Sequence, residues 1–250
     1  MIPITPARLV PAVLAAALLP AAPVAAQTDD EVLVLEELPE EAAAPEDTVQ
    51  LEEITVSASR LETPLAQVPG AVSVVGQQDI QQGRQAIGLD ESLVSVPGLF
   101  MQNRYNFAQD LRLSIRGFGA RSAFGIRGVK ILVDGIPATT PDGQASVDAV
   151  DLDAVARMEV LRGPASSLYG NASGGVVNIL TQEGPPEPFV EIEANAGADD
   201  FGKYLLKAGG EWGPLNAFTT LSRLDFEGFR EHSATESTQF NGKLRYTLDP

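Results

Sequence analysis

The fold of this chain is decided by residues 111–144, LRLSIRGFGARSAFGIRGVKILVDGIPATTPDGQ, and residues 158–180, MEVLRGPASSLYGNASGGVVNIL. These stretches contain three short runs rich in Leu, Ile and Val, at 111–115, 129–133 and 176–180, with glycines close to each run. Short apolar runs bounded by residues that tolerate positive φ are typical of buried strands joined by tight turns. The sequence therefore predicts a small α+β domain built on these strands.

The flanking sequence predicts further elements of this domain. We expect strands at 68–75, 99–102 and 158–161, and short helices at 77–85, 89–96 and 151–157, the second ended by Pro97-Gly98. Five aspartates of the region could be arranged around a cation, but their spacing misses the calcium-loop pattern. We expect them instead in solvated turns and at a helix N-terminus: Asp134, Asp142, Asp148, Asp151 and Asp153.

The composition excludes several classes of function. There is no cysteine, so the chain has no thiolate nucleophile, and His232 is its one histidine. The glycine-rich loops match neither the dinucleotide fingerprint nor a phosphate loop nor a nucleophile elbow. The formal net charge of −17 argues against nucleic-acid binding. We therefore expect no enzyme activity, no cofactor, no bound metal and no nucleic acid.

The first fifty residues read as an address and a tail. Residues 1–26 have one basic residue, Arg8, an apolar core and a small-residue cleavage site, which is the layout of a secretory signal peptide. Residues 27–50 contain nine carboxylates and no Lys or Arg. So much like charge with so little apolar surface predicts a flexible tail.

Residues 51–60, LEEITVSASR, follow the tail. Ile54, Thr55 and Val56 favour an extended conformation, and Pro64 stops a helix from continuing beyond them. An exposed extended segment on a tether can add a strand to the edge of a partner's sheet. The alternative is that this segment is simply the first strand of the next domain.

After residue 184 the apolar pattern changes to a period of two. Alternating segments at 189–196, 203–208, 215–225 and 239–248 predict about four antiparallel strands, joined by turns and a loop at 227–238. Apolar-out and polar-in alternation suits the wall of a transmembrane β-barrel, although a soluble β-meander would show the same pattern. Four strands cannot close into a barrel, and open sheet edges are not tolerated in hydrocarbon. We therefore expect a truncated barrel.

The ordered motifs of the middle region resemble one family. Arg116-Gly117-Phe118, Val133-Asp134-Gly135, the run 160–164 (VLRGP) and the run 169–178 (YGNASGGVVN) are similar in order and spacing to the plug domain of TonB-dependent outer-membrane receptors. The resemblance implies a plug at 61–183, the first strands of an outer-membrane β-barrel at 184–250, and a TonB box at 51–60. It also implies the outer membrane of a Gram-negative bacterium, with the plug inside the barrel and the tail in the periplasm.

The resemblance further implies residue roles. TonB, with its inner-membrane energising complex, would bind Glu53, Ile54, Thr55, Val56, Ser57 and Ala58. Arg116 and Arg162 would pair with glutamates of later barrel strands and lock the plug in place. A cluster of arginines and aromatics reads either as ordinary surface or as contacts for an anionic ligand. The residues singled out as ligand contacts are Arg104, Tyr105, Arg121, Phe124 and Arg127.

The function implied is active, TonB-dependent uptake of a scarce nutrient, an iron–siderophore complex or a similar anionic chelate or cofactor. Pyrroloquinoline quinone and cobalamin are alternative cargoes within the family. The alternative class is a soluble periplasmic ligand-binding module. A hydrolase is disfavoured because a catalytic triad would depend on His232, in a loop. On its own the chain should not transport.

Overall fold

The structure is a computed structural model that describes residues 54–58, 60–102, 105–123 and 125–248. The predicted signal peptide, the acidic tail, Glu53, Arg104 and Phe124 lie outside the described residues. None of the helices in the described part of the chain is long and apolar enough to cross a bilayer.

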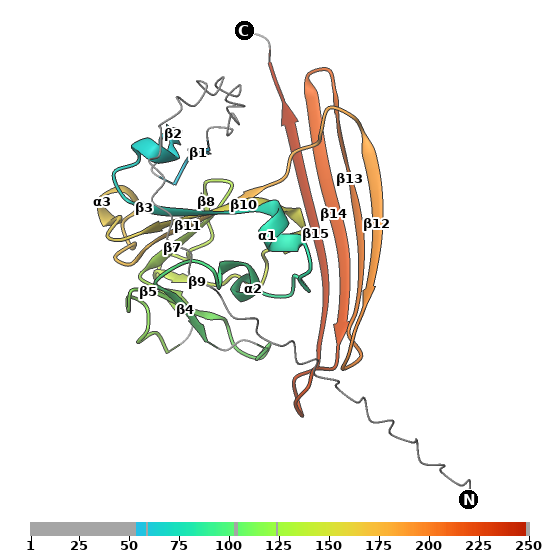
Figure 1. Ribbon diagram of the computed structural model, residues 1–250, viewed down its shortest axis with the longest axis horizontal. Helices are drawn as coiled ribbons and strands as arrows, with labels where there is room; N and C mark the ends of the chain where they lie inside the picture. The colour runs from blue at the N-terminus through green and yellow to red at the C-terminus, as the bar shows by residue number, and fades with distance from the viewer. Residues whose placement is uncertain (1–53, 59, 103–104, 124, 249–250) are drawn as a thin grey trace, which may run out of the picture. The chain divides into compact units, whose positions relative to one another are not determined.

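A five-stranded mixed sheet is the centre of the first half of the described chain (Figure 1). Its strands, in spatial order, are β3 (Ala71–Gly76), β10 (Val155–Arg162), β11 (Gly175–Thr181), β7 (Val129–Val133) and β8 (Ile136–Pro137). β10 pairs antiparallel with both β3 and β11, whereas β11 and β7 are parallel. The three apolar runs that decide the fold are thus β7, β11 and β5 (Arg112–Ile115).

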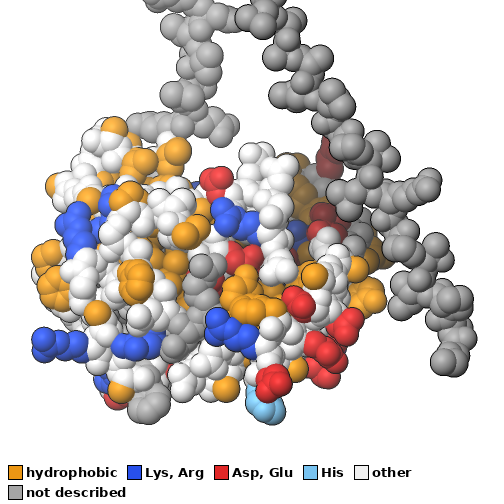
Figure 2. All heavy atoms as spheres, turned by 60° about the horizontal axis from the view of Figure 1, so that its bottom comes forward, with side chains coloured by type: hydrophobic (Ala, Val, Ile, Leu, Met, Phe, Trp, Pro, Cys, Tyr) orange, Lys and Arg blue, Asp and Glu red, His pale blue; other side chains and the backbone are white. Residues whose placement is uncertain are grey.

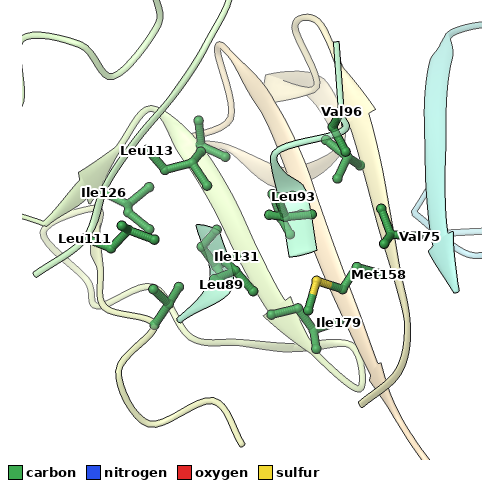
Figure 3. Close-up of a cluster of buried hydrophobic side chains, with 14 of the residues drawn as sticks. Val75, Leu89, Leu93, Val96, Leu111, Leu113, Ile126, Ile131, Met158 and Ile179 are labelled. Carbon is green, nitrogen blue, oxygen red and sulfur yellow. The ribbon is translucent and has the colours of Figure 1, made fainter. Parts of the chain in front are cut away.

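The two faces of this sheet differ because side chains alternate along each strand. Met158 and Ile179, which are opposite each other on β10 and β11, point into the main hydrophobic core. Figure 3 shows these side chains converging with those of α2 and β5. The neighbouring pair, Glu159 and Asn178, points to the other face of the sheet.

Short helices cover the core face. α1 (Gln77–Gln81) and α2 (Leu89–Leu93) are each shorter than the sequence predicts. The expected helix at 151–157 is wrong in its second half: a 3-10 turn, η2 (Leu152–Ala154), is followed directly by β10. Pairing with strands on both sides outweighs the local helical preference there. Asp151 does cap this turn, accepting a hydrogen bond from the Asp153 N–H.

Several small elements complete this half; those at 55–56, 99–102 and 112–115 lie where extended segments are expected, and the others have no clear sequence signal. They are two-stranded pairs and two single helical turns: β1 (Thr55–Val56) with β2 (Thr63–Pro64), β4 (Leu99–Gln102) with β5, β6 (Ile126–Arg127) with β9 (Gln144–Ala145), η1 (Leu65–Gln67) and α3 (Ser166–Tyr169).

Residues 189–246 form a four-stranded antiparallel meander, the wall sheet (Figure 1). Its strands are β12 (Phe189–Ala196), β13 (Gly202–Trp212), β14 (Leu215–Phe226) and β15 (Thr235–Tyr246). Register puts Ile192, Leu206, Leu221 and Phe240 side by side across all four strands. All four are exposed, Ile192 at 81% and Phe240 at 75%. The neighbouring row on the other face is Glu191, Lys207, Thr220 and Asn241.

The two ends of the outward face carry aromatic residues at one end and charged residues at the other. Trp212 and Tyr246 are exposed near the short β13–β14 turn, and the Arg223–Asp225–Glu236 ion pairs lie at the other end. An apolar band flanked by aromatic and charged residues is typical of a barrel wall in a membrane. The expected apolar-out, polar-in wall is therefore confirmed, and its two edges are open in the described residues.

Candidate functional site

The 54–58 segment, which the sequence assigns to partner binding, is docked on the central sheet. Thr55 and Val56 pair with Thr63 and Pro64 of β2, and the Leu65 N–H donates to the Ile54 carbonyl at 2.8 Å. The Val56 and Ala58 side chains are fully buried, whereas Ile54 is 49% exposed. The expectation of an exposed segment is therefore wrong for its second half.

One carboxylate holds this segment. Oε2 of Glu159 accepts hydrogen bonds from the backbone N–H groups of Ser57 (2.9 Å) and Ala58 (2.8 Å), and from Ser57 Oγ (3.2 Å). Glu159 is fully buried, and its other oxygen, Oε1, accepts a hydrogen bond from Arg157 Nε at 3.1 Å. A buried carboxylate normally has such partners, because an unpaired one is very costly.

Two further side chains contact the segment. Asn178 Nδ2 donates to Ser57 Oγ at 3.0 Å and to Glu159 Oε2 at 3.2 Å. The Tyr169 hydroxyl donates to the Ala58 carbonyl at 3.0 Å, and the Arg60 guanidinium lies 4.6 Å from the Tyr169 ring centroid. Burial raises the pKa of the Tyr169 hydroxyl further above neutral pH. We refer to Glu159, Asn178 and Tyr169 as the docking site.

Sequence reasoning missed this site, although one signal was available. Glu159 interrupts the apolar run Met158–Leu161, which lies on a strand with neighbours on both sides. A carboxylate inside such a strand must find internal donors, so its position indicates a structural or functional contact. The nature of that contact depends on residues about a hundred positions earlier, which no local pattern reveals.

The two expected lock arginines come together. The Arg116 N–H donates to the Gly98 carbonyl at 2.8 Å, and Arg162 Nη1 donates to the Pro97 carbonyl at 3.0 Å. Arg162 Nε is buried without a partner, and neither guanidinium forms an ion pair with a carboxylate of the described residues. Their pairing with glutamates of later strands stays a prediction.

The expected ligand contacts differ in what surrounds them. Arg104 and Phe124 lie outside the described residues, and Arg121 is exposed. Arg127 is already paired: its Nη2 lies 2.9 Å from Asp142 Oδ2 and 3.1 Å from Gln144 Oε1. Tyr105 contacts the wall half, with its ring 5.6 Å from that of Phe229. In the view of Figure 2, Lys and Arg side chains are spread over the left and middle of the molecule, and most Asp and Glu side chains lie to the right.

The contact between the central domain and the wall sheet uses wall lysines and domain acids. Lys203 Nζ lies 2.7 Å from Asp153 Oδ2, with the two side chains 6% and 9% exposed. The same ammonium donates to the carbonyls of Gln85 (3.2 Å) and Ala86 (3.1 Å). Thr220 donates to Asp151. Asp151 and Asp153 thus lie at the start of a helical turn, as expected, but both are also buried against the wall.

A second contact of the same polarity involves β15. Lys243 Nζ lies 3.4 Å from Asp134 Oδ1, and Arg245 Nη2 lies 2.5 Å from Glu183 Oε2. These four side chains are at least a quarter exposed, so their ion pairs contribute little to stability. The buried Lys203–Asp153 pair is the stronger attachment.

A cavity of about 240 Å³ lies between the central domain and the wall sheet. Tyr105 and Phe107 line it from the domain, and Ser222 and Leu224 from β14. Asp148 also lines it, and burial, followed by a hydrogen bond with Asp110, raises the pKa of the Asp148 carboxyl. In the part of the chain that the structure describes, no group of three or more His, Cys, Asp or Glu residues could hold a metal ion.

Comparison with known proteins agrees with this architecture. The family model described as TonB-dependent Receptor Plug Domain matches residues 64–176. The vitamin B12 transporter BtuB of Vibrio vulnificus (strain CMCP6) is 31% identical over 147 residues, which are 58% of this chain and 23% of the transporter.

Solved structures show the same arrangement. The ferric yersiniabactin uptake receptor FyuA from Yersinia pestis is 26% identical, with a TM-score of 0.56 over 71% of this chain and 29% of the receptor. The pyoverdine outer membrane receptor FpvA from Pseudomonas aeruginosa PAO1 is 22% identical, with a TM-score of 0.63 over 78% of this chain and 28% of the receptor, and supports the fold alone.

The chain thus spans between 23% and 29% of the length of these three relatives. Plug motifs, the match over residues 64–176 and the outward-apolar wall sheet lead to one assignment. Residues 64–176 match the plug domain of TonB-dependent receptors, and the chain as a whole resembles these outer-membrane receptors from the plug to the opening strands of the β-barrel.

Proposed function

We propose that this chain supplies the plug, the TonB-binding segment and the first wall strands of a receptor that takes up a scarce nutrient across the outer membrane of a Gram-negative bacterium. The observation that carries the proposal is a plug domain followed directly by a sheet with one apolar outward face and one polar face. A soluble binding module would not expose the row Ile192, Leu206, Leu221 and Phe240 to water.

In this proposal the plug occludes the barrel and TonB acts on the 54–58 segment from the periplasm. TonB would add a strand to this segment, with main-chain hydrogen bonds providing affinity. The pairing of Thr55 and Val56 with β2 supports this view, because it establishes that the segment takes an extended conformation. Arg116 and Arg162, both at the Pro97–Gly98 turn, would face glutamates of further wall strands.

We further propose that the cargo is an iron–siderophore complex or a similar chelate or cofactor. FyuA is named for the uptake of ferric yersiniabactin and BtuB for vitamin B12, so two classes of cargo occur among the relatives. Tyr105 supports a ligand role because it lines the 240 Å³ cavity beside the wall. Arg127 is a weaker candidate than Arg121, because Asp142 and Gln144 already occupy its guanidinium.

The partner assignment is tested by co-purification with the C-terminal domain of TonB. The full chain should retain this domain, and a variant lacking residues 51–60 should not. A variant lacking residues 27–36, in the acidic tail, serves as a control for shortening the N-terminus. Retention that survives the deletion of 51–60 would refute the assignment.

The cargo is tested in cells. A strain without the endogenous receptor gene, carrying the complete gene, is grown with ferric siderophores, cobalamin or pyrroloquinoline quinone supplied singly as the limiting nutrient. Rescue that also requires TonB identifies the cargo. Rescue without TonB would contradict active uptake.

A further inference from the structure

Glu159 is a fully buried carboxylate and is not among the expected site residues. Its carboxylate is directed at the 54–58 segment and accepts two backbone N–H groups there. Hydrogen bonds to a charged group are shorter and stronger than those between neutral groups. Glu159 therefore makes the strongest polar contacts of this segment with the sheet.

The segment has two apolar anchors beside these contacts. Val56 and Ala58 are fully buried, and they alternate with Ser57, whose hydroxyl and N–H both reach Glu159. A partner strand cannot pair with residues whose backbone donors are already bound to Glu159. The docked state and the partner-bound state therefore compete for the same backbone groups.

Glu159 is also well placed to resist displacement. It lies on β10, which is the second strand of the sheet and pairs on both sides. The residues just before β10 are attached to the wall by the buried Lys203–Asp153 pair and the Thr220–Asp151 hydrogen bond. Glu159 thus connects the 54–58 segment to a strand that is paired on both sides and follows directly on residues attached to the wall.

We propose that Glu159 is a positioning residue that keeps the 54–58 segment docked and so controls how often TonB can bind it. This inference rests on the proposed function, because it assigns regulation to the same segment. If only a fraction of molecules has the segment released, the apparent affinity for TonB falls by that fraction. Asn178 and Tyr169 support the docked state through their hydrogen bonds to Ser57 and Ala58.

The docked state can be measured without TonB. The chain has no cysteine, so a Val56→Cys variant carries one thiol, at a fully buried position. A maleimide reagent should label it slowly in the full chain and about tenfold or more faster with Glu159→Gln, since the neutral amide loses the charge-assisted hydrogen bonds. Tyr169→Phe, which removes a single hydrogen bond to Ala58, should give a smaller increase.

Two controls separate release of the segment from general loosening of the fold. Glu91→Gln alters another carboxylate that accepts backbone N–H groups, those of residues 85–88, and should leave the Val56→Cys labelling unchanged. An Ala145→Cys thiol, buried in the main core, should stay slow with Glu159→Gln. Equal acceleration at both thiols, or at neither, would overturn the proposal.

The link to TonB is tested on the same variants, without the cysteine. Binding of the TonB C-terminal domain should tighten with Glu159→Gln by about the factor found in labelling, and it should disappear when residues 51–60 are deleted. Faster labelling with unchanged TonB affinity would overturn control by Glu159 while leaving the proposed function standing. TonB binding that survives the deletion would refute the proposed function and, with it, this control.

Discussion

At the scale of single residues, Lys203 makes the buried ion pair between the wall and the plug, with Asp153. Burial raises the pKa of the Asp153 carboxyl, and Lys203 is the main influence that lowers it. Of the smaller effects, the charge of Asp151 raises this pKa and that of Lys207 lowers it. Removing Lys203 leaves a buried carboxylate without its partner, which typically costs about 3–5 kcal/mol. Lys203→Met should therefore lower the unfolding midpoint at pH 7.

This loss should depend on pH. A carboxyl whose folded-state pKa is raised adds stability below its unfolded pKa, and that contribution is lost as the pH rises through the folded pKa. The gap between Lys203→Met and the unsubstituted chain should therefore narrow as the pH falls from 7 towards 4. Adding Asp153→Asn to Lys203→Met should recover part of the loss at pH 7. A gap that is constant with pH would contradict this account.

Gly184 is the second residue with a specific requirement. It follows the plug, and Asn216 binds both its N–H (2.9 Å) and its carbonyl (2.7 Å). A Cβ at this position would lie 2.4 Å from the carbonyl oxygens of Gly210 and Ala217. Gly184→Ala should therefore lower the free energy of unfolding by an amount typical of overpacking, about 1–3 kcal/mol, and with it the thermal midpoint.

The control for Gly184 is Gly202, on β13, where an added Cβ meets nothing within 4 Å. Gly202→Ala should leave the unfolding midpoint close to that of the unsubstituted chain. If both alanine variants behave alike in thermal unfolding, the close packing around Gly184 does not constrain the junction between plug and wall.

At the scale of elements, the wall strands make the clearest prediction. Ile192 and Glu193 are neighbours on β12 but lie on opposite faces. Ile192→Arg places a charge on the lipid face, at a cost of about 2–4 kcal/mol near the bilayer midplane, whereas Glu193→Arg places it on the inner face. The yield of folded receptor in the outer-membrane fraction should fall for Ile192→Arg alone. Equal yields would contradict the assigned faces.

Elements also show how far the sequence leads. β7 and β12 match their expected bounds, because a run rich in Val, Ile and Leu between glycines and a strict period of two each identify a strand without tertiary information. The expected helix at 151–157 becomes β10 after one turn, because β3 and β11 pair with it. β1 was expected as an extended segment, but Glu159, which docks it, lies a hundred residues away.

At the scale of the whole molecule, the plug is attached to the wall through its acidic side chains. Domain acids meet wall lysines and an arginine on β13 and β15, whereas Arg116 and Arg162 have no carboxylate partner in the described part of the chain. The sequence resemblance anticipated only the arginines. The lysine–aspartate attachment depends on the register of β13 against the plug, which alternation alone does not determine.

Coupling to TonB is the central claim, and site-specific crosslinking in cells tests it most directly. A photoreactive residue at Ile54, exposed on the 54–58 segment, is compared with one at Ile136, which is 70% exposed on β8. The account predicts a TonB crosslink from position 54, stronger with Glu159→Gln, and none from position 136. Crosslinks of equal yield from both positions, or from position 136 alone, would contradict it.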